Sequence, residues 1–325
     1  MSETATRAVD APWVWQGDAL RLDESLVPLA DDSLAELAVV ASALQGQDGP
    51  IEDLRPDDFT LSASAAPIAG IRERLYRGCG FAILDRLPVE RWGERTSKAL
   101  AWLLVGLLGP IVMQKRDGTR LYEVRDTGTA MGHGVRRSIT NLEQELHTDG
   151  GWLPLAPELV CLACMRQAER GGWSRVASLG TAHNRLLAED PMALERLYRP
   201  FYWDRQAEHG PEETPCSRHP VFQREKATLT ARYYDDYLRN GQRLMAEPLA
   251  EADEAALQAL RAILEAPENR IAFRLEPGQI AFFHNHRIAH ARSAFEDDAP
   301  QGGRLLLRLW VRAQGGIAFE PAPSA

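Results

Sequence analysis

The order of helical and strand-like segments along the chain is the feature that most restricts its fold. Apolar residues recur at helical spacing mainly in the first third of the sequence, over residues 34–44, 68–78 and 88–108. Strand-like apolar runs fall mainly in the second half, over residues 158–165, 270–275, 280–283 and 304–312. A doubly wound parallel sheet needs regular alternation of strands and helices, which this order lacks. The pattern therefore predicts an α+β fold with an antiparallel core.

The chain shows no Pro-, Gly- or Ser-rich linker that would divide its 325 residues. We therefore expect a single domain over residues 1–325, in which residues 1–70 form an irregular and helical N-terminal extension packed on the core. We expect Trp13 and Trp15 in this extension to pack against the protein core.

Charge and hydropathy exclude two classes of partner. The net charge of −9 comes without a cluster of basic residues, so nucleic-acid binding is not expected. The longest apolar stretch, Ala99–Met113, is too short to span a bilayer and is broken by Gly109-Pro110. The N-terminus lacks the charged start and apolar run of a signal peptide, so a cytoplasmic location is expected. Assembly as a homo-oligomer is left open.

Cys161 and Cys164 form a CxxC sequence inside the strand-like run "ELVCLACMR". Residues three apart on a strand point to opposite faces, and no second CxxC accompanies this one. We therefore interpret the pair as packed core thiols rather than as a zinc or redox motif.

Two short motifs contain residues suited to binding a metal ion. In "ELHTDGGW", His147 and Asp149 are two residues apart, so both side chains face the same way in an extended segment. In "FFHNHRIAHARSAF", three of the eight histidines, His284, His286 and His290, fall within seven residues, in a predicted short loop after an apolar strand. An HxD pair with one later histidine is the two-His-one-carboxylate set, which leaves open coordination positions and suits Fe(II). A structural zinc site would instead prefer four ligands with thiolates.

The last strand-like run, "GGRLLLRLWVR", has an arginine at every fourth position among apolar residues. Leu305, Leu307, Leu309 and Val311 would share one face, and Arg304, Arg308 and Arg312 the other. Arg304 and Arg308 would lie about 13 Å apart along the backbone, at roughly 3.3 Å per residue. An arginine on an apolar strand is costly to bury without an anion. Each of these two side chains could therefore bind a different carboxylate near one centre.

These residues resemble a known family. The blocks "LHTDGGW", "GGWSRVAS", "NHRIAHARSAF" and "GGRLLLRLWVR" follow one another between about residues 140 and 312, and "GFAILDRLP" near residue 80 also fits. In this order they are similar to the iron(II)/2-oxoglutarate-dependent dioxygenases of the taurine dioxygenase / γ-butyrobetaine hydroxylase / clavaminate synthase-like superfamily. The resemblance implies a double-stranded β-helix (jelly-roll) core with flanking helices.

The resemblance also implies roles for individual residues. His147, Asp149 and His290 would bind Fe(II), and Arg304 and Ser174 would bind the distal carboxylate of the cosubstrate 2-oxoglutarate. Further candidates for contact with the substrate are Arg308, Arg292, Asn141 and Arg125. In some family members the position of Arg308 meets an anionic group of the substrate, and in others it supports the cosubstrate.

The implied reaction is the hydroxylation of an unactivated C–H bond of a small molecule by O2, with release of succinate and CO2. Family halogenases lack the carboxylate ligand, so the presence of Asp149 favours hydroxylation or a related hydrogen abstraction. Ala291 replaces a glycine that is frequent in the family. His284 and His286 are not part of the usual ligand set, and we expect them to be neighbours of the site or surface residues.

Three alternatives stay open. The same site could perform desaturation, epoxidation or ring closure, which nothing in the sequence separates from hydroxylation. A non-catalytic sensor on the same scaffold would be expected to have lost a ligand or Arg304. A zinc or manganese hydrolase or isomerase would not need a buried arginine such as Arg304, paired with Ser174, for a dicarboxylate.

The substrate is the least determined part of the prediction. Residues 111–146 and 204–220 are polar segments without clear periodicity, and we interpret both as candidate lids. The first contains Arg116, Arg125, Arg136 and Arg137, which together with Arg308 favour an anionic or amino-acid-like substrate. A solvated loop would have the same composition, so this inference depends mainly on Arg308.

Overall fold

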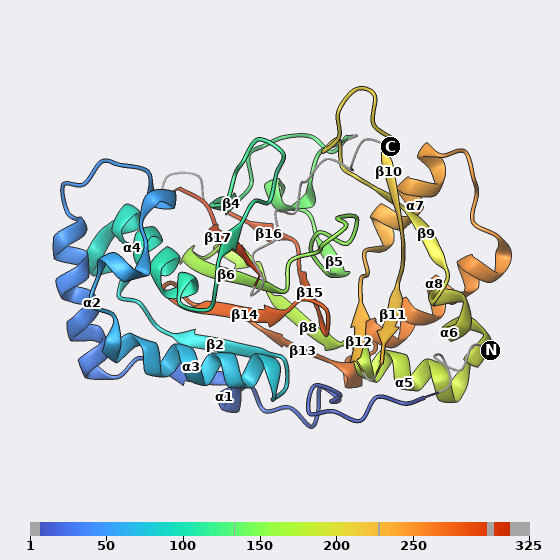
Figure 1. Ribbon diagram of the computed structural model, residues 1–325, viewed down its shortest axis with the longest axis horizontal. Helices are drawn as coiled ribbons and strands as arrows, with labels where there is room; N and C mark the ends of the chain where they lie inside the picture. The colour runs from blue at the N-terminus through green and yellow to red at the C-terminus, as the bar shows by residue number, and fades with distance from the viewer. Residues whose placement is uncertain (1–6, 133, 227, 298–301, 313–325) are drawn as a thin grey trace.

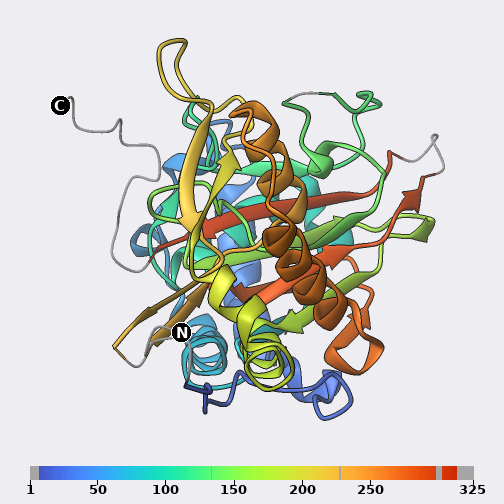
Figure 2. The ribbon, with the colours of Figure 1, turned by 90° about the vertical axis from the view of Figure 1, so that its right-hand side faces the viewer.

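Two facing β-sheets lie between two groups of helices in the computed structural model, which describes residues 7–132, 134–226, 228–297 and 302–312. Helices α2–α4 are at one end of the molecule in Figure 1 and helices α5–α8 at the other. Figure 2 looks onto the second end, with α7 and α8 in front of the sheets. This arrangement is the predicted α+β jelly-roll with flanking helices.

The elements follow one another in the order in which Figure 1 labels them. The helices are α1 (Leu22–Ser25), α2 (Asp31–Leu44), α3 (Ser62–Tyr76), α4 (Val89–Gly106), α5 (Leu179–Glu189), α6 (Pro191–Leu197), α7 (Asp235–Leu244) and α8 (Glu251–Glu265), with short 3-10 turns η1 (Ile51–Asp53), η2 (Pro56–Asp58), η3 (Arg137–Ile139) and η4 (Pro267–Asn269). The strands of the two large sheets are β1 (Leu26–Pro28), β2 (Phe81–Asp85), β3 (Ile111–Val112), β4 (Tyr122–Val124), β5 (Gln144–His147), β6 (Leu159–Arg166), β8 (Ser174–Ser178), β13 (Arg270–Phe273), β14 (Ile280–His284), β15 (Ile288–Arg292) and β17 (Leu305–Val311). Smaller two-stranded ribbons are formed by β7 (Arg170–Gly171), β9 (Pro200–Asp204), β10 (Cys216–Pro220), β11 (Phe222–Glu225), β12 (Thr228–Ala231) and β16 (Phe295–Glu296).

The larger sheet has the strand order β1-β2-β14-β6-β17-β3, and β4 also pairs with β17. One of its faces packs on helices α2–α4, and the other faces the second sheet. Strand β17 shows why the sequence alternates there. Leu305, Leu307 and Leu309 belong to the core under the helices, whereas Leu306 and Trp310 belong to the core between the sheets. The predicted division of this strand into two faces is confirmed.

The smaller sheet has the order β13-β8-β15-β5 and carries the two histidine motifs. Strands β15 and β5 are antiparallel neighbours, and their register places His290 directly opposite His147. On the other side of β15, Arg292 lies opposite Ser174 of β8. Directly opposed residues of antiparallel strands have their Cβ atoms about 5 Å apart. The register of three strands thus brings together residues that are far apart in the sequence.

The N-terminal residues are joined to both cores. Strand β1 extends the large sheet by parallel pairing with β2. Trp13 and Trp15 are buried in the core between the sheets, as predicted, and the Trp15 indole N–H donates to the carbonyl of Cys79. Residues 1–6 lie outside the described part of the chain.

The sequence-based assignment was wrong in two segments that surround the site. The candidate lid at 111–146, predicted from its lack of periodicity, contains strands β3 and β4, and both strands pair with β17. The segment after the β14 strand, predicted to be a loop, contains strand β15 with His290. Strands of two to five residues are too short for their periodicity to be detected in a mixed polar sequence.

The candidate lid at 204–220 is partly regular. Residues Cys216–Pro220 form strand β10, which pairs with β9, and the polar residues 205–215 connect the two strands. Helices α5 and α6 are separated at Asp190-Pro191, where Asp190 ends α5 and its carboxylate accepts from the Ala193 N–H at the start of α6.

Cys161 and Cys164 are free and buried on opposite faces of β6, one in each core, as the strand geometry predicted. Burial raises the pKa of the Cys164 thiol to about 12. Among the described residues, no helix has the length and apolar character needed to cross a membrane.

Candidate active site

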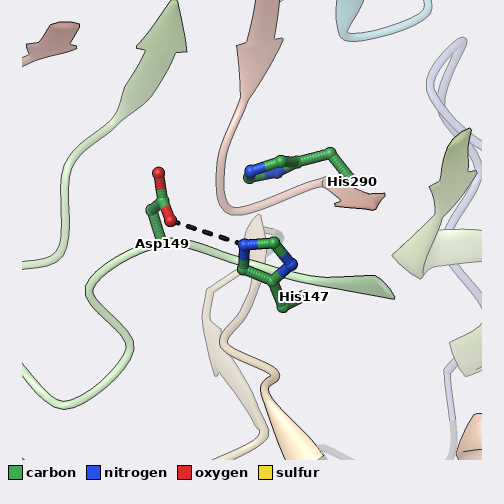
Figure 3. A group of neighbouring side chains, drawn as sticks. All are labelled: His147, Asp149 and His290. Atoms are coloured by element: carbon green, nitrogen blue, oxygen red, sulfur yellow. Dashed lines mark ion pairs between the residues drawn. The ribbon is translucent and has the colours of Figure 1, made fainter. Parts of the chain in front are cut away.

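His147, Asp149 and His290 form a buried cluster between the two sheets (Figure 3). Each offers one potential ligand atom, and these atoms all lie within 4.8 Å of one another. The His147 and His290 rings have their centroids 4.4 Å apart, as expected for an opposed pair on neighbouring strands. His147 Nε2 lies 3.5 Å from Asp149 Oδ1, the contact drawn as a dashed line in Figure 3. This set of donors on one side of a cavity fits Fe(II) with open positions.

Hydrogen bonding fixes the orientation of the His147 ring. One ring nitrogen, Nδ1, is 2.7 Å from the carbonyl oxygen of Glu145, which can only accept. Nδ1 therefore donates to that carbonyl, and Nε2 is the ring nitrogen that faces Asp149. The Gln144 amide nitrogen also lies 2.9 Å from Nε2, so a metal bound there would displace this contact.

His290 is held in the neutral form that metal binding requires. Burial lowers the pKa of His290 to about 3, and the neighbouring His147 contributes in the same direction. Its ring stacks on Phe283, with centroids 5.1 Å apart, which fixes its plane.

The backbone of Asp149 is fixed by Asn285. The Asp149 N–H donates to Asn285 Oδ1 at 2.8 Å, and Asn285 Nδ2 donates to the Asp149 carbonyl at 2.9 Å. Asn285 lies between β14 and β15, so this contact joins the loop of the first motif to the sequence block of the second. Asn285 is 1% exposed and has no contact with solvent that would compete.

The carboxylate of Asp149 is held by two side chains of β17. Trp310 Nε1 donates to Oδ2 at 2.9 Å, and Arg308 Nη1 donates to Oδ1 at 3.2 Å. Burial by itself would raise the pKa of Asp149, but Arg308 and the two histidines outweigh it and hold the pKa well below its usual range. Asp149 is therefore ionised at neutral pH, as a metal ligand must be.

A cavity beside the histidines contains three arginine side chains, and we call it the arginine-lined cavity. Its lining combines both sheets and consists of Val124, Ser138, Gln144, His147, Leu162, Ser174, His290, Ala291, Arg292, Arg304, Leu306 and Arg308. Arg304 is 2% exposed, and burial lowers the pKa of its guanidinium to about 10. Its Nε donates to Gln167 Oε1, whereas its buried Nη1 has no hydrogen-bond partner among the described residues. An unpaired N–H of a buried cation marks a position where an anion would be stabilised.

A second cavity adjoins the first at Ser138, Gln144 and Arg308, and we call it the aromatic-lined cavity. Its lining consists of Arg136, Ser138, Gln144, Thr148, Asp149, Gly150, Trp152, Tyr234, Tyr237, Arg308 and Trp310. Tyr234 and Tyr237 stack with centroids 4.1 Å apart and form one wall. Arg308 lies between the rings of Tyr122 and Trp310, and its Nε donates to Gln114 Oε1 at 2.7 Å. This cavity has one edge at Asp149, so it borders the cluster of potential metal ligands.

The two candidate lids contact each other through ion pairs. Arg136 pairs with Glu208, and Arg116 pairs with Glu213 at 2.8 Å. Both side chains of the first pair are nearly buried, with Arg136 12% and Glu208 11% exposed. The charges of these arginines are therefore offset by acids of the chain. They give less support to an anionic substrate than the sequence suggested.

The predicted substrate-binding residues are divided by the structure. Arg308 and Arg292 line the arginine-lined cavity, and Arg308 lines both cavities. Asn141 is exposed and lines neither cavity, and its carbonyl accepts from the Phe295 N–H. Arg125 is 54% exposed and lies 3.4 Å from Glu123. His284 and His286 are outside the ligand cluster, with His284 packed on the ring of Tyr76.

Several residues at the site were not identified from the sequence. Trp310 could have been found, because it lies two residues after Arg308 on the same strand face. Asn285 was noted as part of a motif, but without a role. Gln114 and Gln144 carried no signal, since a glutamine in a polar segment gives no indication of burial.

Comparisons with known proteins agree with this geometry. Residues 47–310 match the model of the family described as "Taurine catabolism dioxygenase TauD, TfdA family". The FR-33289 synthase of Streptomyces rubellomurinus (strain ATCC 31215) is 28% identical over 331 residues, covering 100% of this chain and 96% of the relative. A uridine-5'-phosphate dioxygenase of a Streptomyces species is 32% identical over 205 residues, covering 61% of this chain and 71% of the relative.

A solved structure of similar fold is that of an asparagine oxygenase in complex with Fe(II), 2S,3S-3-hydroxyasparagine and succinate. It has a TM-score of 0.64 and 22% sequence identity, and the alignment covers 88% of this chain and 93% of that one. The match of the family model covers most of the chain and includes all three residues of the buried cluster. The chain therefore belongs to the taurine catabolism dioxygenase TauD, TfdA family, the iron(II)- and 2-oxoglutarate-dependent dioxygenases that its motifs resemble.

Proposed function

We propose that this protein hydroxylates an unactivated C–H bond of a small, anionic or amino-acid-like metabolite, using Fe(II), 2-oxoglutarate and O2 and releasing succinate and CO2. The observation that carries the proposal is the adjacency of two features in one cavity. A cluster of two histidines and one ionised carboxylate lies beside Arg304, whose buried Nη1 has no partner in the described part of the chain. A hydrolytic metal site would have no use for this arginine.

Each residue has a defined task in this proposal. His147, Asp149 and His290 hold the ferrous ion, which supplies the redox chemistry when it is bound with 2-oxoglutarate and O2. Arg304 and Ser174 bind the distal carboxylate of 2-oxoglutarate and so fix its orientation. Trp310 and Arg308 keep the Asp149 carboxylate ionised and in place.

The substrate would occupy the aromatic-lined cavity. Asp149 offsets the charge of Arg308 in this structure, but a bound divalent cation would take up most of that negative charge. Arg308 would then face the cavity as a buried cation with little compensation, which favours an anionic group on the substrate. The walls formed by Trp152, Tyr234 and Tyr237 would shield the remaining part of the substrate from water.

Anaerobic reconstitution tests the proposal. Addition of Fe(II) and 2-oxoglutarate should produce the weak visible charge-transfer band of this ligand set, and His290→Ala should remove it. His284→Ala is the matched control, because His284 is equally buried but lies outside the cluster, and it should keep the band. A band that survives in His290→Ala and disappears in His284→Ala would show that the ligand assignment is wrong.

Admission of O2 then allows a screen for succinate release. The neighbour with hydroxyasparagine and the relative named for uridine 5'-phosphate recommend two groups of compounds, amino acids and phosphorylated metabolites. We expect substrate-dependent succinate release with at least one anionic compound and a product heavier by one oxygen atom. A product lighter by two hydrogen atoms would instead identify a desaturase.

A further inference from the structure

Two buried guanidinium groups line one cavity whose described lining contains no acidic side chain. Arg292 is 6% exposed and Arg304 is 2% exposed, and both line the arginine-lined cavity. Both lie against the ring of Phe295, with the guanidinium carbons 4.8 Å and 5.3 Å from its centroid. Among residues 7–132, 134–226, 228–297 and 302–312, neither arginine forms an ion pair. Two like charges buried on one aromatic ring repel each other unless an anion joins them.

Strand geometry directs Arg292 toward the position of Ser174. Arg292 follows His290 by two residues on β15, so both side chains lie on the same face of the sheet. Its direct partner on β8 is Ser174, the residue to which the resemblance assigns a contact with the cosubstrate carboxylate. Arg292 therefore approaches that carboxylate position from the strand of the distal histidine, and Arg304 approaches it from the large sheet.

The hydrogen bonds of Arg292 are incomplete in a specific way. Its Nη2 donates to the carbonyl oxygens of Leu142 and Arg137, which hold one end of the guanidinium. Its Nε and Nη1 are buried and have no hydrogen-bond partner within the part of the chain that the structure describes, and the same is true of Arg304 Nη1. A guanidinium presents these N–H groups in a planar fork that matches a carboxylate. The chain thus orients three unpaired donors around one small cavity.

We propose that Arg292 is a second cosubstrate-binding arginine, which together with Arg304 holds the distal carboxylate of 2-oxoglutarate. This inference rests on the proposed function for the identity of the ligand. It replaces the role in substrate binding that the sequence suggested for Arg292. Of these two cavities, Arg292 lines only the arginine-lined one, Arg136 lines only the aromatic-lined one, and Arg308 lines both.

The test measures binding rather than turnover, with two ligands that differ only in the group concerned. Isothermal titration calorimetry of the Mn(II)-loaded protein is performed with 2-oxoglutarate and with 2-oxopentanoate, which has a methyl group in place of the distal carboxylate. The variants are Arg292→Gln, Arg304→Gln and, as a surface control, Arg125→Gln. Arg292→Lys is added because it keeps a cation at the same place.

We expect Arg292→Gln to weaken the binding of 2-oxoglutarate by about 10- to 100-fold. Binding of 2-oxopentanoate should change less than threefold, because this ligand has no group for Arg292 to contact. Arg292→Lys should lie between the wild type and Arg292→Gln, and Arg125→Gln should match the wild type. Equal weakening of both ligands would show that Arg292 only supports the loop at Leu142, and would overturn the proposal.

The failure of this inference differs from the failure of the proposed function. If the wild type binds neither ligand, the protein does not use a 2-oxo acid at all. If Arg304→Gln loses 2-oxoglutarate selectively and Arg292→Gln does not, the cosubstrate site is correct but Arg292 has no part in it. An effect of Arg292→Gln confined to the KM of the prime substrate would likewise overturn the proposal. It would indicate that Arg292 binds the substrate.

Discussion

The hydrogen bond from Trp310 to Asp149 should contribute measurably to metal affinity. In Trp310→Phe the indole N–H that donates to Asp149 Oδ2 at 2.9 Å is lost, while an aromatic ring still faces Arg308. The carboxylate is buried, so no water from bulk solvent readily replaces this donor. A hydrogen bond to a charged group contributes about 1.5–3 kcal/mol. At about 1.4 kcal/mol per decade, metal binding should weaken by roughly 10- to 100-fold.

The measurement is a titration with Mn(II), in which the signal of the free ion is followed by electron paramagnetic resonance. Trp102→Phe is the matched control. Trp102 is also a buried indole under an arginine, Arg120, and its N–H donates at 3.0 Å to the carbonyl of Leu54, far from the metal ligands. The control should lose a similar amount of stability against urea but bind Mn(II) like the wild type.

Two results would refute this reasoning. If Trp310→Phe binds Mn(II) within twofold of the wild type, the Asp149 carboxylate does not depend on the indole for its orientation. If Trp102→Phe weakens Mn(II) binding as much as Trp310→Phe does, the effect comes from general loosening of the fold.

Three further outcomes follow from the same contacts. Asp149→Gly should abolish hydroxylation in the succinate-release assay, because it removes the carboxylate of the ligand set, and retention of most wild-type turnover would argue against a ligand role. Arg304→Ala should raise the apparent KM for 2-oxoglutarate by roughly one to two orders of magnitude, because a charge-assisted contact of about 1.5–3 kcal/mol is lost. An unchanged KM in steady-state kinetics would show that Arg304 is not part of the cosubstrate site. Burial lowers the pKa of His183 to about 4 from its ordinary value of 6.5. The unfolded chain therefore binds the proton more readily, and the free energy of unfolding should fall as the pH decreases from about 6.5 toward 4, by up to about 1.4 kcal/mol per pH unit for this group. Urea unfolding at pH 7 and pH 5 measures this, and a smaller decrease is expected for His183→Gln; equal stability at both pH values would contradict the argument.

The cluster of His147, Asp149 and His290 was predictable because strand geometry and motif spacing act together. His147 and Asp149 needed only the two-residue period of an extended segment. The choice of His290 over His284 and His286 needed the family resemblance, since the three are equivalent in composition and spacing. The structure supplies the physical reason for the choice, because the register of β15 places His290 opposite His147.

The contacts around the ligands were less predictable. Arg308 was expected to contact the substrate or support the cosubstrate, and it lines both cavities, but its contacts with Asp149, Gln114 and two aromatic rings were not predicted. Arg125 was grouped with Arg136 because both lie in one polar segment, yet only Arg136 reaches a cavity. These outcomes depend on how β3 and β4 pair with β17, and strands of two or three residues leave no periodic signal.

The ion pairs between the two polar segments have a consequence for the engineering of this enzyme. The two candidate lids, residues 111–146 and 204–220, are separated in the sequence by the strands that carry His147 and Ser174. Arg136 and Glu208 nevertheless neutralise each other, and both are almost buried. Replacing one segment alone would leave a buried charge without its partner, at a cost of several kcal/mol. The segments therefore form one exchangeable unit. We expect a library that diversifies only one segment to contain many misfolded variants. Transferring both segments together to a relative would keep the Arg136–Glu208 ion pair.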